Sequence, residues 1–437
     1  MLDRQEFPIW LWVPFLTLLA CAPGSTKLAG LGWLLIVVAG LVCMVRMAIA
    51  RDRFWTPEDP EILQAARTWL MFCLLAFFFK FVGVLYWSDP IGTRHFDFRM
   101  LLSALAIHFF VARVTIERAR SSALVVSLMV ASIVGLTFSY LHVSFDVDTP
   151  SNRINWAGGQ VMLSWVLLSA AASDALTARW RGLAAVGFLV FWMAVLLSGA
   201  RSAYLSLPWV VAAGMMLLMS KTGPATRGRW LLLLTMGAAA LTVILTLTSP
   251  KVVQVPMSRI VLAVEQARVA LGWETDQPRD VNTPVGSRLY MWQRSLEVIK
   301  ESPWIGYGRE QRIAFIKEWG READAHIVKD QFHLHSEYIN GMVDHGVVGL
   351  ASTASYMIGL LVVAWRLRRR HGLMSLAVAG VAFTHITMSI TNANSQTNNY
   401  SVVFGLAMML IFLFRFGGIR PKESSAQDAP LPAFPWR

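Results

Sequence analysis

The residues of this 437-residue chain that could carry chemistry gather in one polar insert, residues 250–345, which interrupts a series of apolar runs. The most informative are His333 and His335, which lie just before a short helical pattern. Ser336 is expected to cap that helix, which leaves His335 at the positive helix end, where the charged form is disfavoured and the pKa falls. A neutral imidazole accepts a proton at neutral pH, so the pattern predicts that His335 is a general base. A structural role is the alternative.

A His-x-His pair can also indicate metal binding, but the sequence offers too few further ligands. Asp330 and Glu337 are the carboxylates close by, and no helical His-Glu-x-x-His arrangement is present. The three cysteines, Cys21, Cys43 and Cys73, fall within apolar runs, so they support neither a disulfide framework nor a thiolate site. We therefore expect no metal site.

Two arginines are candidates for binding an anion. Arg201 follows the tight turn 198–200 between two apolar runs and is expected at or near the start of the next helix. Arg288 is expected in the first turn of a helix that Ser287 caps. The unpaired amides of a first helical turn, together with a guanidinium, suit a phosphate. The alternatives are an interfacial anchor for Arg201 and a solvated side chain for Arg288.

One cation lies inside an apolar run, and several aromatic residues lie close to the motifs. A charge such as Lys80 at the centre of a span costs about 2.5–3.5 kcal/mol, so it usually faces a polar cavity or an anion. Snorkelling to the outer interface is the alternative. Trp292 is expected to share an apolar helix face with Leu296, in packing or at the substrate site. Trp304 belongs to the turn 302–308, and Tyr338 to the short helix after His335.

The elements that must position these residues are membrane helices. The chain is 55% hydrophobic and only 15% charged, against about 25% charged in soluble proteins. Runs of about 20 apolar residues are long enough to cross a bilayer. We expect about twelve spans, at 8–24, 28–49, 66–87, 100–117, 122–143, 157–176, 182–198, 202–219, 230–249, 346–365, 373–390 and 399–415.

The distribution of basic residues orients these spans. With both termini cytoplasmic, the inner loops hold clusters such as those around Arg113, Arg181 and Arg368, whereas the short outer loops are poor in cations. This positive-inside asymmetry accounts for most of the net charge of +12 without a nucleic-acid partner. The predicted organisation is spans one to nine (1–249), an outer loop (250–345), spans ten to twelve (346–416) and a disordered cytoplasmic tail (417–437).

The motifs in this order resemble the O-antigen ligase/polymerase family of bacterial envelope glycosyltransferases. Their shared elements are an outer turn ending in arginine, an arginine followed by tryptophan, an aromatic glycine turn, and a histidine motif leading into a glycine-containing span: residues 198–201, Arg288 with Trp292, 303–308, 335–338 and 346–350. Most relatives have His-Asn where this chain has His335-Ser336, a departure that keeps a capping residue.

The resemblance implies an all-α, GT-C-like polytopic fold in which a mainly helical periplasmic loop covers a cavity facing the outer leaflet of the bacterial inner membrane. It implies an undecaprenyl-diphosphate-linked glycan as donor and lipid A–core as acceptor, with no metal and no other cofactor. Twelve spans with one large late loop resemble the ligases more than the polymerases, and the chain is expected to be a monomer among membrane lipids. An O-antigen polymerase, a protein O-oligosaccharyltransferase and a transporter of the lipid-linked glycan are the alternatives.

Within that reaction, Arg201 and Arg288 are expected to clamp the diphosphate and stabilise the charge that builds on the leaving group. Lys80 can supply a third cation. His335 is expected to take the proton of the attacking hydroxyl in a single, inverting displacement. The acceptor is expected to approach past His333, Tyr338 and Trp304, and Trp292 is a further substrate-binding candidate.

Overall fold

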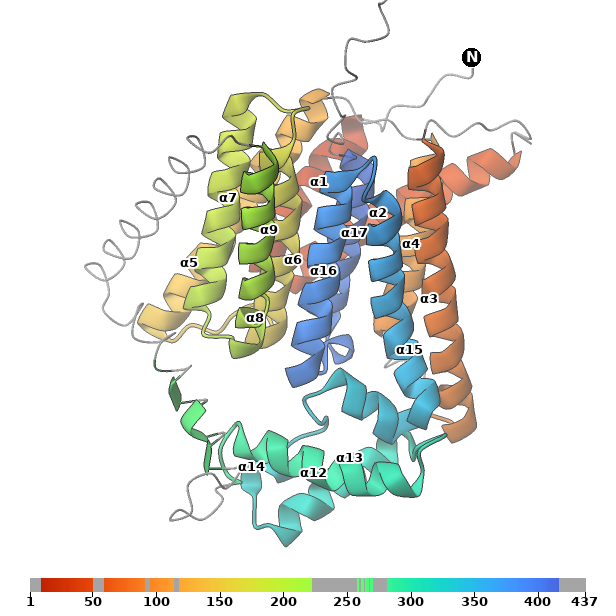
Figure 1. Cartoon of the computed structure of the whole chain (residues 1–437), viewed down its shortest axis with the longest axis vertical. Helices are drawn as coiled ribbons and strands as arrows, with labels where there is room; N and C mark the ends of the chain where they lie inside the picture. Colours follow the sequence, from red (N-terminus) through yellow and green to blue (C-terminus); the bar gives the residue numbers. More distant parts are fainter. Residues whose placement is uncertain are drawn as a thin grey trace, which may run out of the picture.

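The computed structural model describes residues 9–49, 59–90, 95–113, 118–221 and 281–415, and a few scattered positions between 258 and 269. Every regular element in these ranges is helical. The long bundle (Figure 1) consists of α1 (Ile9–Cys21), α2 (Thr26–Ile49), α3 (Pro60–Trp87), α4 (His95–Arg113), α5 (Arg118–Phe145), α6 (Arg153–Ala172), α7 (Ala178–Leu197), α9 (Leu207–Lys221), α15 (Glu337–Leu367), α16 (Gly372–Thr391) and α17 (Asn398–Phe414). The short elements are η1 (Ala22–Gly24), α8 (Arg201–Tyr204) and η3 (Asn394–Gln396).

The bundle has the length and surface of a polytopic membrane protein. In the described ranges six helices are long and apolar enough to cross a bilayer, and α1 and α17 are shorter apolar helices. Large apolar side chains such as Val38, Leu74 and Phe78 remain exposed on the outer faces of α2 and α3, as expected where lipid is the solvent. Eleven of the predicted spans overlap a helix. The ninth, 230–249, lies outside the described residues, and the number of crossings stays a prediction.

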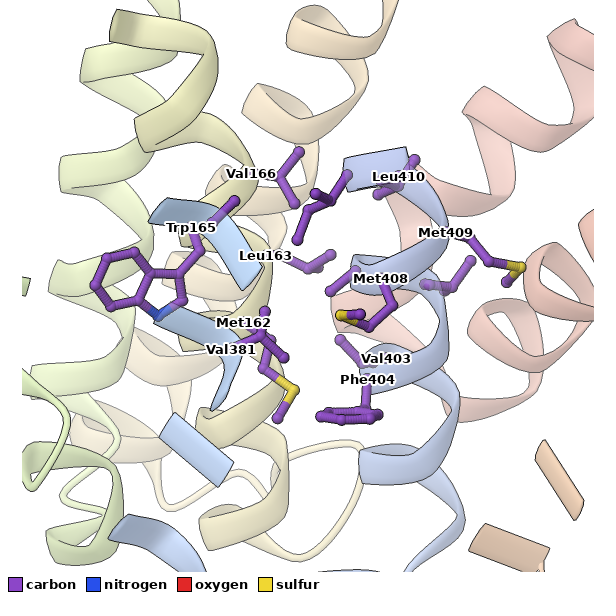
Figure 2. Close-up of a cluster of buried hydrophobic side chains, with 14 of the residues drawn as sticks. Met162, Leu163, Trp165, Val166, Val381, Val403, Phe404, Met408, Met409 and Leu410 are labelled. Atoms are coloured by element: carbon purple, nitrogen blue, oxygen red, sulfur yellow. The ribbon is translucent and has the colours of Figure 1, made fainter. Parts of the chain in front are cut away.

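The core of the bundle is built around α17, whose residues from Asn399 to Phe414 are all buried. A helix that is apolar on every side belongs at the centre of a fold. Figure 2 shows Phe404 and Met408 of α17 among side chains of α6 and α16. Trp165 of α6 fits there because Gly380 has no side chain: a Cβ at that position would lie 2.0 Å from the indole ring.

The polar insert forms a separate layer of helices at one end of the bundle. It comprises α12 (Gly286–Glu301), α13 (Gly308–Glu322) and α14 (His326–Lys329), with the first turns of α15 (Figure 1). The layer has a small apolar core of its own, formed by Met291, Ile316, Ala325, Val328, Leu334, Val343 and Trp319. This core holds the helices of the layer together outside the bundle.

A kink in α15 joins the layer to the bundle, at the place where the sequence analysis put the end of the outer loop. The backbone leaves helical geometry at His345 and at Gly346, which has φ 60°. The turn predicted at 302–308 is confirmed and packs against this kink, with the Tyr307 amide donating to the Val343 carbonyl at 2.9 Å. A Cβ on Gly346 would lie 2.3 Å from the carbonyl carbon of Trp304, so both the positive φ and the close approach require glycine.

Candidate functional site

Four residues predicted from the sequence form a basic cluster, defined as Arg201, Arg288, His333 and His335. Arg201 begins α8, Arg288 lies in the first turn of α12, and the histidines lie just before α15. Burial, and then the positive charge of Arg201, lower the pKa of Arg288 to about 10. The two guanidinium groups, which come from different parts of the chain, are therefore near enough to repel one another, and both histidines also lie within the field of Arg288.

The turn that presents Arg201 is held from within the bundle. Gly199 has φ 64°, and the Ala200 amide donates to the Ser198 hydroxyl at 3.2 Å. The hydroxyl of Thr391, at the end of α16, donates to that of Ser202 at 2.8 Å. α8 begins at Arg201, as predicted, but the single span predicted at 202–219 is two helices, because the chain breaks between α8 and α9.

The start of α12, which presents Arg288, differs in detail from the prediction. Val285 occupies the N-cap position, and the hydroxyl of Thr283 accepts a hydrogen bond from the Gly286 amide at 3.0 Å. Ser287 is instead buried inside the first turn, so its predicted capping role is wrong. Leu296 was predicted on the buried face, but it is 55% exposed, since Met291 and Ser295 face the layer core.

The two histidines are placed by hydrogen bonds to the residue between them. The indole N–H of Trp292 donates to the Leu334 carbonyl at 2.7 Å, and the Leu334 amide donates to the side chain of Asn340 at 2.9 Å. Leu334 itself is fully buried in the layer core. Trp292 therefore supports the histidine segment from α12, and its predicted contact with substrate stays a prediction.

The rings of His333 and His335 pack edge to face, with centroids 4.2 Å apart. The His335 amide donates to Nδ1 of His333 at 3.3 Å, which leaves the proton of a neutral His333 on Nε2. His335 Nε2 lies 2.8 Å from Oε1 of Gln331. Nδ1 of His335 is buried and has no hydrogen-bond partner among the described residues. Nε2 of His335 thus has a hydrogen-bond partner, whereas Nδ1 has none among the described residues.

Both imidazoles are neutral at neutral pH. Burial, followed by the charges of Arg312 and Arg288, lowers the pKa of His333 to about 4. Burial, followed by His333 and Arg288, lowers the pKa of His335 to about 2. The direction matches the prediction for His335, but burial and positively charged neighbours are the cause. Among the described residues, no three His, Cys, Asp or Glu side chains gather as a metal site requires.

The motif around His335 is anchored to the end of the bundle. Ser336 takes the N-cap position of α15, but its side chain makes no capping bond and its hydroxyl contacts the Ser389 carbonyl at 3.5 Å. The amide of Ser395 donates to Glu337 at 3.0 Å, and its hydroxyl also donates to that carboxylate. The polar segment 391–399 is partly buried, with Asn392, Ala393, Asn394 and Asn399 inaccessible, and the Asn392 amide donates to Asn155 of α6 at 2.7 Å.

The other three predicted binding residues outside the basic cluster lie at different places. Lys80 lies on α3, and its charge acts on the carboxylates of Glu337 and Asp344. The hydroxyl of Tyr338 donates to the Ile386 carbonyl at 3.0 Å, which gives it a structural partner in α16. Trp304 is 72% exposed on the turn beside the kink of α15. Substrate contacts of all three stay predictions.

The structure also contains a second polar group that the sequence did not reveal. We call it the ion-pair cluster: Arg312 with Asp344, and His345 with Asp89. Arg312 Nε lies 2.5 Å from Asp344 Oδ1, with both side chains buried, and His345 Nε2 lies 3.0 Å from Asp89 Oδ2. Gly83 on α3 leaves room for the His345 ring, since a Cβ there would lie 2.4 Å from it. The signal in the sequence was the acidic residue directly before His345, but its partners lie far along the chain.

Fold and site together define a class of protein. The chain is a polytopic helical membrane protein with a basic, histidine-containing cluster in which residues of a separate layer of helices lie near Arg201 of the bundle. The sequence model of the O-antigen ligase family matches residues 186–354, a range that includes all four residues of the basic cluster. This match supports an assignment of the chain to the O-antigen ligase family.

A curated protein of Haemophilus influenzae, described as an uncharacterized protein, is 25% identical to this chain over 239 residues. The matched part is 52% of this chain and 56% of that protein. The chain therefore spans little more than half the length of this relative. The similarity carries no information on the substrate.

Proposed function

We propose that the protein is an O-antigen ligase, which transfers a glycan from undecaprenyl diphosphate to a hydroxyl of lipid A–core. The observation that carries the proposal is the pairing of two arginines with a neutral histidine: the charge of Arg201 acts on Arg288, and His335 presents a buried nitrogen with no hydrogen-bond partner. A diphosphate resolves the repulsion between the arginines, because its charge offsets both of theirs.

In this mechanism Arg201 and Arg288 bind the diphosphate and stabilise the charge that develops on it as the glycosidic bond breaks. Loss of one such donor costs roughly 10²–10³ in rate. Lys80 lies on a neighbouring helix and adds positive charge on the membrane side. The lipid tail stays in the bilayer, so the diphosphate is presented where α8 meets the layer of helices.

His335 acts as the general base. The acceptor hydroxyl attacks the anomeric carbon, its proton passes to Nδ1 of His335, and the electron pair of the glycosidic bond leaves with the diphosphate. The low pKa of His335 makes it a weak base in the free enzyme, and a bound diphosphate raises that pKa because it offsets the charge of Arg288. With no covalent glycosyl intermediate, one displacement inverts the anomeric configuration.

The proposed setting is the inner membrane, with both termini in the cytoplasm and the layer of helices in the periplasm. A polymerase would use the same donor with a second lipid-linked glycan as acceptor. A protein O-oligosaccharyltransferase would use a protein hydroxyl. Family membership and the basic cluster are compatible with all three acceptors, so the acceptor is the point to test.

The test uses a strain that lacks the gene, complemented with wild type, His335→Ala, Arg201→Ala or Arg288→Ala at matched expression. His326→Ala and Arg321→Ala are matched controls, because both side chains are exposed on the same layer of helices. Lipopolysaccharide is resolved by size on a gel, and the pool of lipid-linked glycan is measured alongside.

We expect the three site variants to lose the whole O-antigen ladder and to accumulate long lipid-linked chains, while both controls retain the ladder. Single repeats on lipid A–core without longer rungs would instead identify a polymerase. An intact ladder in all three site variants rules out the catalytic assignment.

A further inference from the structure

The side-chain amide of Gln331 contacts two groups, and together they fix its orientation. Its Nε2 donates to the Ile327 carbonyl at 3.2 Å. A carbonyl oxygen only accepts hydrogen bonds, so the nitrogen of the amide must face Ile327 and the oxygen must face His335. That oxygen lies 2.8 Å from Nε2 of His335. Since the amide oxygen also only accepts, Nε2 of His335 must carry the proton.

We propose that Gln331 is a positioning residue that holds His335 in the tautomer with its proton on Nε2 and its free lone pair on Nδ1. The proposal deepens the proposed function, on which it rests, because it names which nitrogen is the base and which residue selects it. In the other tautomer Nδ1 would carry the proton, and Nε2 would place a lone pair against the lone pairs of the amide oxygen.

The fold holds Gln331 firmly enough for this role. Gln331 follows α14, and its amide donates to the Val328 carbonyl at 3.0 Å. Val328 is fully buried in the layer core. The end of α14 lies directly on Gly320 of α13, where a Cβ would be 2.6 Å from the Lys329 amide nitrogen. The position of Gln331 is therefore set by packing between α13 and α14, independently of His335.

The proton balance of the reaction agrees with this assignment. The acceptor O–H bond breaks, its proton forms a bond to Nδ1, and the oxygen bonds the anomeric carbon while the diphosphate leaves with the electron pair. The imidazolium that results keeps its Nε2–H bond to Gln331, so the ring need not turn during the step. A fixed ring avoids the loss of rate that accompanies misorientation of a base.

The first experiment reads the tautomer directly in the full-length protein, without substrate. Histidine is labelled with ¹⁵N, and the signals of His335 are identified by their absence in His335→Ala. We expect the wild type to show a protonated Nε2 and a bare Nδ1, and Gln331→Met, which keeps the length of the side chain, to lose this preference. A protonated Nδ1 in the wild type, or an unchanged tautomer in Gln331→Met, contradicts the proposal.

The second experiment measures transfer by the purified full-length protein, with lipid-linked glycan and lipid A–core extracted from the deletion strain. We expect Gln331→Met to transfer glycan roughly tenfold more slowly than wild type, which is the effect of one lost hydrogen bond on a catalytic group. We expect Gln331→Glu to transfer at the wild-type rate, because a carboxylate also accepts a hydrogen bond from Nε2. The added negative charge raises the pKa of His335, so Gln331→Glu loses activity at a higher pH than wild type as pH falls.

Gln311→Met is the matched control, since Gln311 is exposed on α13, and we expect it to match wild type. If Gln331→Met also matches wild type while His335→Ala is inactive, Gln331 has no positioning role but the base assignment stands. If His335→Ala is active, His335 is not the general base and the mechanism of the proposed function is wrong. Thermal unfolding of each variant shows whether a lower rate results from a less stable fold. A pH–rate profile of Gln331→Glu identical to that of wild type also contradicts the proposal that Gln331 selects the tautomer of His335.

Discussion

The basic cluster and the ion-pair cluster lie in neighbouring parts of the molecule but hold their charges in opposite ways. In the ion-pair cluster Arg312 and Asp344 neutralise one another at 2.5 Å. In the basic cluster Arg288 faces a second arginine and has no ion pair among the residues that the structure describes. Paired buried charges hold a structure together, whereas neighbouring like charges attract an anion. The comparison separates residues expected to stabilise the layer from residues proposed to bind a substrate.

Substitution of His335 should have the largest effect on the transfer rate and little effect on stability. We expect His335→Ala to lower the transfer rate by roughly 10²–10⁴, the contribution of a general base. The melting temperature should fall only slightly, because the variant loses one side-chain hydrogen bond, from Nε2 to Gln331, which is worth about 1 kcal/mol. Single-turnover kinetics and thermal unfolding in the same detergent check both parts. A fall in melting temperature that accounts for the loss of rate would make His335 structural.

Arg312 tests the other cluster. We expect Arg312→Met to lower the free energy of unfolding by about 3–5 kcal/mol, because it leaves Asp344 buried without its partner. The double variant Arg312→Met with Asp344→Leu should recover much of the loss, since both charges are then removed. Denaturation of all three proteins measures the effect. A double variant no more stable than Arg312→Met would mean that the pair contributes something other than neutralisation.

Arg288 should behave in the opposite way to Arg312. We expect Arg288→Gln to lower the rate by roughly 10²–10³ and to leave stability unchanged or slightly higher, because repulsion from Arg201 is relieved. The charge of Arg288 lowers the pKa of both histidines. Its removal should therefore raise both pKa values, so that each imidazole takes up its proton at a higher pH. A ¹⁵N titration of the free protein checks the sign, and a downward shift is incompatible with the clustering.

The smallest effect should follow from substitution of Trp292, which holds the segment that contains the two histidines. Trp292→Phe removes the hydrogen bond to the Leu334 carbonyl, which is worth about 1 kcal/mol, while it keeps an aromatic ring in place. We expect a loss of rate of about fivefold, in kcat more than in KM. Kinetics at varied donor concentration measure the split. A change in KM alone would favour the substrate contact that the sequence suggested for Trp292.

Much of the fold could be predicted because its signals are local. Apolar runs marked the helices, and the turn at 302–308 was evident from its glycines. The exposed Leu296 and the kink at Gly346 could not be predicted, because they follow from contacts with distant elements. The start of α12 was misplaced for a local reason, since the Gly286 amide donates to the Thr283 hydroxyl and Val285 takes the N-cap position. The burial of Asn392, Asn394 and Asn399 could not be predicted either, since a polar loop has the same composition whether water or protein satisfies its hydrogen bonds.

The sequence by itself determined that this is a membrane protein and predicted Arg201, Arg288 and His335 as the residues of the reaction, because hydropathy and residue type can be read directly from the chain. Only the tertiary structure decided that Arg201 and Arg288 act on one another, that Gln331 holds Nε2 of His335, and that His345 pairs with Asp89. Two of these contacts join residues far apart in sequence, and the third depends on how α14 packs on α13. A one-dimensional pattern carries no distance between such groups, so these contacts could be found only in the fold.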